Sequence, residues 1–166
     1  VRFIKKGQSL GLASASNVAI QKARGRYLMR VDADDILLPH AAGTMLRAME
    51  EGAGAVYAAY HETNDQAVVI EPNVDPRKVH HAGCALFDHR LINEIRFTEG
   101  LRHFDGADLH KRIIAKNMPV AYVTRPLWLY RRHDKNHSNS DPAERARVRE
   151  DLKIGYATAT SSWFAA

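Results

Sequence analysis

The order of apolar and polar segments predicts an α/β fold with a mostly parallel central sheet flanked by helices. A strand-like segment at residues 1–4 is followed by a loop, an alanine-rich helical segment at 13–23 and an apolar strand at 27–32. Strand, loop, helix and strand in this order are typical of a βαβ unit, and hence of a parallel sheet. Three aspartates stand at the end of the second strand, where such sheets bind their ligands. They are Asp32, Asp34 and Asp35.

The chain as a whole has the composition of a globular domain. Its 166 residues include 45% hydrophobic and 26% charged residues, and one domain is expected at this length. No apolar run approaches the roughly 20 residues that span a bilayer. The single cysteine, Cys84, excludes an internal disulfide and fits a reducing compartment, so we expect a cytoplasmic location. The net charge of +5 suits an anionic ligand or peripheral association with the inner face of a membrane, and is too mild to predict nucleic-acid binding.

Two helices are predicted in the first half of the chain. The helix over 13–23 has its apolar residues near one side, and Gly25 suits the position just after its end. Pro39 suits the first position of a second helix, which Gly52 ends. Strands are expected at 1–4, 27–32, 55–60 and 67–70.

The second half is predicted to continue with alternating strands and helices. The expected strands are 83–87, 120–123 and 127–130, and the expected helices are 90–95 and 104–117. Asp141-Pro142-Ala143-Glu144 has the residues of a capping box, which predicts a charged helix to about Tyr156 with a solvated arginine face. Residues 141–166 are therefore expected to form a C-terminal helix and tail outside the main portion, 1–140.

The aspartate cluster at the strand end predicts a metal site. Asp32 and Asp34 lie on the same face of an extended segment and can converge on one ion. The cluster repels itself without a positive partner, and hard divalent cations such as Mn²⁺ or Mg²⁺ prefer carboxylate oxygen. We expect Asp34 to be the metal ligand and the cluster to bind a diphosphate. The alternative is that these aspartates cap the next turn and are solvated.

Several runs resemble the middle of family 2 glycosyltransferases of the GT-A fold. That family typically shows Ala-x-Gly-x-Tyr and then Asp-x-Asp-Asp, and this chain has Ala23-Arg24-Gly25-Arg26-Tyr27 and then Asp32-Ala33-Asp34-Asp35. Further agreement comes from the runs 11–20, 83–87, 97–101 and 128–133. The match covers roughly residues 1–138. The resemblance implies that residues 1–140 are a GT-A-like catalytic portion, with a partial Rossmann-like half and an acceptor-side half. It also implies a fragment that lacks the family's N-terminal nucleoside-binding third.

The resemblance implies a metal-dependent glycosyltransferase that moves a sugar from a nucleotide-sugar donor to an acceptor hydroxyl. The acceptor would be a saccharide or a lipid-linked molecule, as in polysaccharide biosynthesis, and inversion at the sugar carbon is expected. The donor-binding positions implied are Gly11, Asn17, Asp32, Asp34 and Arg132. His133 would join Asp34 at the metal, as a C-terminal histidine does in many GT-A enzymes. A solvated basic loop is the alternative for Arg132 and His133.

The catalytic base is the point at which this chain departs from the family. The family usually carries Glu-Asp before a late helix, and that aspartate is its expected base. In Phe104-Asp105-Gly106-Ala107-Asp108, Asp105 takes the place of the glutamate and Gly106 takes the place of the base. We expect Asp105 to serve if the turn is shifted, with Asp108 as the second candidate. The alternative for Asp105 is a first-turn residue favoured by the helix dipole.

Two other functions remain open from the sequence. Some metal-dependent phosphohydrolases place a nucleophilic Asp-x-Asp at a strand end, although Asp35-Ile36 fits their pattern poorly, and trapping of an aspartyl-phosphate would identify them. A domain that kept the fold but lost the base is the third hypothesis, and Gly106 supports it. A transfer assay separates that domain from an enzyme.

The pair His80-His81 is interpreted as a surface feature, with acceptor contact as the open alternative.

Overall fold

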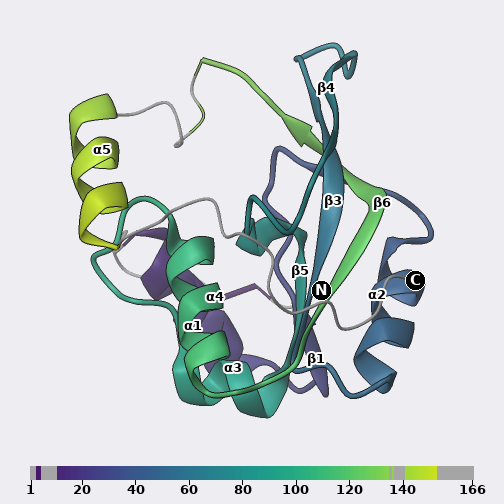
Figure 1. Cartoon of the computed structure of the whole chain (residues 1–166), viewed down its shortest axis with the longest axis vertical. Helices are drawn as coiled ribbons and strands as arrows, with labels where there is room; N and C mark the ends of the chain where they lie inside the picture. The colour runs from purple at the N-terminus through teal and green to yellow at the C-terminus, as the bar shows by residue number, and fades with distance from the viewer. Residues whose placement is uncertain (1–2, 5–10, 135, 137–140, 153–166) are drawn as a thin grey trace.

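The computed structural model describes residues 3–4, 11–134, 136 and 141–152. One mixed sheet lies between helices on its two faces, and the last helix stands to one side (Figure 1). The helices are α1 (Leu12–Lys22), α2 (Ala41–Glu50), α3 (His89–Ile95), α4 (Asp105–Ala115) and α5 (Pro142–Asp151), with a short 3₁₀ turn, η1 (Ala82–Cys84). The strands are β1 (Tyr27–Met29), β2 (Ile36–Leu37), β3 (Ala55–Thr63), β4 (Val69–Val74), β5 (Ala85–Asp88) and β6 (Val120–Arg131). None of these helices is long and apolar enough to cross a membrane.

The sheet has the strand order β1-β5-β3-β6-β2, and β4 pairs with β3 off this path. The α/β class is therefore confirmed, but the prediction of a mostly parallel sheet is wrong. Within the described residues β3 and β6 are parallel, whereas the other pairings are antiparallel. Parallel neighbours need a long crossover connection, and here the segment through α3 and α4 supplies it before β6. β5 runs against both β1 and β3, which places those two strands in the same direction.

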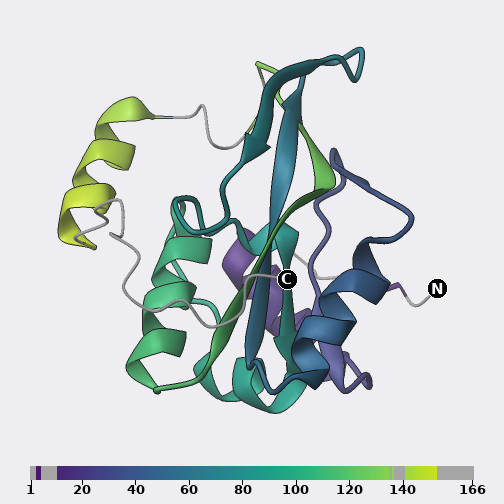
Figure 2. The same ribbon diagram turned by 45° about the vertical axis from the view of Figure 1, so that its right-hand side comes forward.

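The core has two parts, one on each face of the sheet. Residues of β3 alternate between them: Ala55 and Tyr57 pack with α1, α3 and α4, whereas Val56 and Ala58 pack with α2. Both faces of β3 are buried, as expected for a central strand that reads as one apolar run. Figure 2 shows the same layers from another side, with α2 on the face opposite α4.

Several predicted element boundaries differ from the structure. Phe3 and Ile4 are not in a strand, and Phe3 is 97% exposed. The helix at 12–22 ends in an extended Ala23, so Gly25 is not its left-handed cap. The two late strands are one strand, β6, with a register irregularity opposite Pro126, which has no N–H to donate. Gly52 does end α2, with φ +103°.

The capping box before α5 is confirmed in part. The Asp141 carboxylate accepts a hydrogen bond from the Glu144 N–H at 2.9 Å, and Pro142 is the first helical residue. The predicted continuation from 153 to Tyr156 lies outside the described residues, as do residues 1–2 of the predicted first strand.

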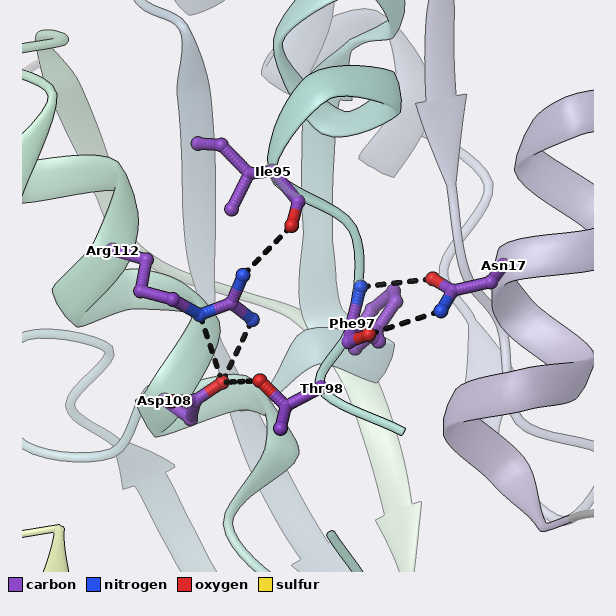
Figure 3. Close-up of polar contacts among 6 residues, drawn as sticks. All are labelled: Asn17, Ile95, Phe97, Thr98, Asp108 and Arg112. Atoms are coloured by element: carbon purple, nitrogen blue, oxygen red, sulfur yellow. Dashed lines mark hydrogen bonds and ion pairs between the residues drawn. The ribbon is translucent and has the colours of Figure 1, made fainter. Parts of the chain in front are cut away.

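The connection between α3 and α4 is held by one polar side chain of α1 and two of α4 (Figure 3). The side-chain amide of Asn17, on α1, donates to the Phe97 carbonyl at 2.9 Å and accepts from the Phe97 N–H at 2.8 Å. Asp108, on α4, accepts from the Thr98 hydroxyl at 2.7 Å and from Arg112 at 2.7 and 3.0 Å. Arg112 also donates to the Ile95 carbonyl at 2.8 Å. These bonds fix the chain that leads into the first turn of α4.

We expect the substitution Asn17→Ala to destabilise the fold. It leaves the buried N–H and C=O of Phe97 without their partners, which should lower the free energy of unfolding by about 2–4 kcal/mol. Urea denaturation measures this change. The control is Gln21→Ala, an exposed position on the same helix, where a change within about 0.5 kcal/mol is expected. Equal effects of the two variants would contradict a structural role for Asn17.

Candidate active site

A cavity of about 1000 Å³ opens where the polypeptide leaves β1. Its wall includes the segment after β1, the segment before η1, and the start of α4. The polar side chains central to the argument are Arg30, Asp32, Asp34, His81 and Asp105, all of which line it. Polar residues therefore gather at the end of this strand, as predicted. The first turn of α4, far along the chain, contributes Asp105 to the same cavity.

Asp32 has a positive partner in the protein itself. The Arg30 side chain approaches it with Nε 3.0 Å from Oδ1 and Nη2 3.4 Å from Oδ2. The expectation that a divalent cation is the positive partner of the cluster is therefore wrong for Asp32, whose partner is Arg30. This carboxylate lines the cavity and has an arginine as its partner.

Asp34 has a different environment, in which two side chains from the segment after β6 converge on one oxygen. His133 Nε2 lies 3.0 Å from Oδ2 of Asp34, and the Asn136 amide donates to the same oxygen at 3.4 Å. Asn136 is buried and also donates to the Arg131 carbonyl, which holds the segment against the aspartate. Asp34 and His133, which are 99 residues apart in the chain, are thus in contact.

The Asp34–His133 pair fits a divalent cation as part of a ligand set. Two neighbouring ligands, each about 2.1 Å from an octahedral ion, lie about 3 Å apart, and 3.0 Å is also the length of the hydrogen bond that joins this imidazole to this carboxylate. Within the described ranges no group of three or more His, Cys, Asp or Glu side chains is arranged to hold a metal. Such ions commonly take only one or two protein ligands and complete their shell with phosphate oxygens and water.

Asp35 points away from this pair and into the protein. Its Oδ1 accepts from the Arg131 N–H at 3.2 Å, while Oδ2 is buried without a hydrogen bond from the described residues. Burial, together with the nearby carboxylates of Asp32 and Asp34, raises the pKa of Asp35 to about 7, against the lowering effects of the Arg131 hydrogen bond and of Arg30. The third aspartate is therefore anchored to β6 and does not face the cavity with the other two.

Asp105 lies at the first residue of α4 and faces the cavity. Its Oδ2 receives Nη1 of Arg30 at 2.6 Å, so that one arginine bridges Asp32 and Asp105. Gly106, the next residue, has no room for a side chain. A Cβ there would lie 2.2 Å from the His80 carbonyl oxygen and 2.7 Å from the Ala82 nitrogen. The backbone of the segment before η1 thus occupies the space in which a carboxylate at position 106 would begin.

Other predicted site residues are not brought to the cavity. Gly11 starts α1 with φ +85°, Asn17 binds Phe97, and Asp108 binds Thr98 and Arg112; none of the three lines the cavity. Asp108 is therefore bound to Thr98 and Arg112 and does not face the cavity in which a base would act. Arg132 does line the cavity, but its Nε lies 3.4 Å from Oε2 of Glu62.

Some cavity residues were not identified by sequence reasoning. Arg30 was counted only as part of the strand, yet a charge just before three aspartates is a signal of an internal ion pair. His80 and His81 line the cavity, so their interpretation as a surface pair is wrong. Burial lowers the pKa of both imidazoles, to about 4 for His80, which favours their neutral forms. Arg145 and Arg149 of α5 also line the cavity, so the arginine face of that helix is not wholly solvated.

Comparisons with known proteins agree with the geometry. The family described as "Glycosyl transferase family 2" matches residues 1–134. Glycosyltransferase GlyG of Streptococcus pneumoniae serotype 4 (strain ATCC BAA-334 / TIGR4) is 26% identical over 158 residues, which cover 80% of this chain and 52% of that protein.

Solved structures with the same fold include the S. aureus protein TarS. Residues 1–349 of TarS in complex with UDP-GlcNAc have a TM-score of 0.66 at 16% identity, covering 88% of this chain and 47% of that one. A second structure of TarS 1–349 has a TM-score of 0.58 at 13% identity, covering 73% of this chain and 40% of that one. This chain thus spans about half the length of the relatives it matches.

We expect position 106 to accept no side chain. Gly106→Ala should lower the free energy of unfolding by roughly 2–3 kcal/mol because its Cβ would overlap the His80 carbonyl. The control is Gly43→Ala on α2, where a Cβ meets nothing within 4 Å, and a gain of up to about 1 kcal/mol is expected. Denaturant melts of both variants measure the difference. A Gly106→Asp variant that folded normally and turned over faster would refute this account.

Proposed function

Since the chain belongs to glycosyltransferase family 2, we propose that it transfers a sugar from a nucleotide-sugar donor to an acceptor hydroxyl. The observation that carries the proposal is that Asp34 and Asp105 line one cavity, and that His133, which does not itself line it, contacts Asp34. The UDP-GlcNAc complex of TarS supports a uridine diphosphate sugar as the first donor to test. We keep residues 1–140 as the catalytic portion, although Arg145 and Arg149 also line the cavity.

We propose that Asp34 and His133 hold Mn²⁺ or Mg²⁺ together with the donor diphosphate. One carboxylate oxygen and one imidazole nitrogen at 3.0 Å form a partial ligand set, and phosphate oxygens and water would supply the remainder. When bound, the cation offsets the negative charge that develops on the departing diphosphate. Asn136 orients the Asp34 carboxylate for this purpose, because it donates to the oxygen that also meets His133.

Asp105 is the proposed base for the acceptor hydroxyl. It is the carboxylate of the late-helix motif that lines the cavity, whereas Asp108 is bound to Arg112 and Thr98. Proton transfer from the hydroxyl to Asp105 would accompany attack of the oxygen on the anomeric carbon, opposite the diphosphate. A single displacement of this kind inverts the configuration, and analysis of the product anomer by NMR tests that outcome.

The acceptor is proposed to be a saccharide or a lipid-linked molecule, with the cytoplasm as the site of action. The reduced, buried Cys84 is compatible with that compartment. Peripheral contact with the inner face of a membrane stays a proposal that rests on the net charge of +5.

A donor-binding domain without transfer activity is the second candidate, and the blocked position at Gly106 favours it. Nucleotide binding by the protein without turnover of any sugar donor, in the presence of candidate acceptors, would support that reading. Turnover of a nucleotide sugar would exclude it.

The metal proposal predicts that nucleoside diphosphate binding depends on Asp34. Calorimetry with UDP, GDP and dTDP, with and without Mn²⁺, should detect binding that the metal strengthens. Asp34→Asn and His133→Ala should each weaken the metal-dependent part roughly 10- to 100-fold, while the melting temperature is kept. Asp65→Asn, at an exposed turn, is the control and should bind as the unmodified protein does. Metal-dependent binding that survives in Asp34→Asn would remove the metal role.

The base proposal predicts a loss of turnover in Asp105→Asn. The value of kcat should fall roughly 10²- to 10⁴-fold because the hydroxyl has no proton acceptor, while the Kd for the nucleoside diphosphate changes little. The matched variant is Asp108→Asn, which should lower stability through the lost Arg112 and Thr98 bonds and leave more of the turnover. Full activity in Asp105→Asn with a selective loss in Asp108→Asn would reassign the base.

A further inference from the structure

Arg30 makes a pair of contacts that the proposed reaction does not yet use. It directly follows β1, and its guanidinium lies between carboxylates that come from different parts of the chain. Nε is 3.0 Å from Oδ1 of Asp32, and Nη1 is 2.6 Å from Oδ2 of Asp105, which is 75 residues away. The side chains are 14%, 23% and 21% exposed, so these bonds are more shielded from water than an ordinary surface pair.

The guanidinium of Arg30 also contacts an aromatic ring. Its central carbon lies 5.5 Å from the centre of the Phe97 ring, within the range of a cation–π contact. Phe97 is in turn fixed by both of its backbone bonds to Asn17. Burial lowers the pKa of Arg30, but Asp105 and Asp32 outweigh that effect and the pKa is raised, so the side chain stays charged.

We propose that Arg30 is a positioning residue that holds the Asp105 carboxylate in a fixed place in the cavity relative to Asp32. This inference rests on the proposed function, in which Asp105 takes the acceptor proton. Because Arg30 binds Oδ2, the other oxygen of Asp105, Oδ1, is the one assigned to the acceptor hydroxyl. Arg30 gives the Asp105 carboxylate a defined orientation. An aspartate in the first turn of a helix without such a partner lacks it.

A positioning role predicts a particular division between binding and turnover. If Arg30 acts through Asp105, its loss disturbs the geometry of proton transfer, where a shift of about 1 Å costs roughly 100-fold. The bound nucleotide would be little affected. If Arg30 instead serves the donor pocket through Asp32, its loss weakens nucleotide binding. If the ion pairs are only structural, stability falls and the apparent kcat falls only in proportion to the folded fraction, so kcat is expressed per folded molecule.

The test uses Arg30→Met and Arg30→Lys in the purified protein. The expected result for Arg30→Met is a 10- to 100-fold loss of kcat, on the order set by misplacement of a catalytic group, with the donor KM and the Kd for UDP within about twofold. Arg30→Lys keeps one charge but cannot bridge two carboxylates with a planar fork, so it should recover only part of kcat. The matched control is Arg112→Met on α4, which breaks another arginine–aspartate pair outside the cavity. It should lower the melting temperature and lower the kcat of the folded fraction by less than Arg30→Met does, because it reaches Asp105 only through the connection between α3 and α4.

A double-mutant cycle with Asp105→Asn tests whether the two residues act as one unit. In the Asp105→Asn background, Arg30→Met should lower kcat less than about threefold, far less than Arg30→Met lowers it in the unmodified protein. The reason is that the carboxylate positioned by Arg30 is already lost. The full separate losses would multiply if Arg30 acted on its own.

The inference is overturned by an unchanged kcat in Arg30→Met, by a loss confined to the Kd for UDP, or by multiplying losses in the cycle. It is also overturned if both Arg30→Met and Arg30→Lys fail to fold, since Arg30 would then be a folding residue. These outcomes leave the proposed function standing so long as the unmodified protein transfers sugar. An unmodified protein that binds no nucleoside diphosphate and transfers no sugar would refute the function itself.

Discussion

The ion pairs of Arg30 connect two parts of the molecule that the sheet alone does not join. Asp32 lies just after β1, which is at one edge of the sheet. Asp105 is the first residue of α4, a helix that covers one face of the sheet. Two carboxylates in one cavity would repel each other, and the shared guanidinium reverses that interaction. The protein itself thereby offsets one of the two negative charges on this wall of the cavity.

The backbone before β5 is the second constraint on this site, and glycines permit it. A Cβ at Gly106 would overlap the His80 carbonyl, and one at Gly83 would lie 3.0 Å from Oδ2 of Asp32. The segment from His80 to Gly83 therefore passes close to both aspartate-bearing elements. A side chain at either glycine would move this segment, His81 or an aspartate, so the cavity wall depends on two small residues that carry no chemistry.

Residues at family-like positions divide into two groups in the structure. Asp34 and Asp105 reach the cavity, whereas Asn17 and Asp108 hold the connection between α3 and α4. Both groups serve the same end, because that connection leads into Asp105 and presents the Phe97 ring to Arg30. A motif match gives a residue's position along the chain, but not the direction in which its side chain points.

The amino-acid sequence by itself determined the α/β class, most helices and strands, the aspartates at the end of β1 and the cap of α5, because each depends on residues within a few turns of one another. Even the pairing of Asp34 with His133 was available through the family resemblance. Tertiary structure decided the antiparallel placement of β5, the inward turn of Asp35 and the pairing of Arg30 with Asp105. Those features depend on which distant segments pack together, and no local periodicity encodes a contact between side chains 75 residues apart.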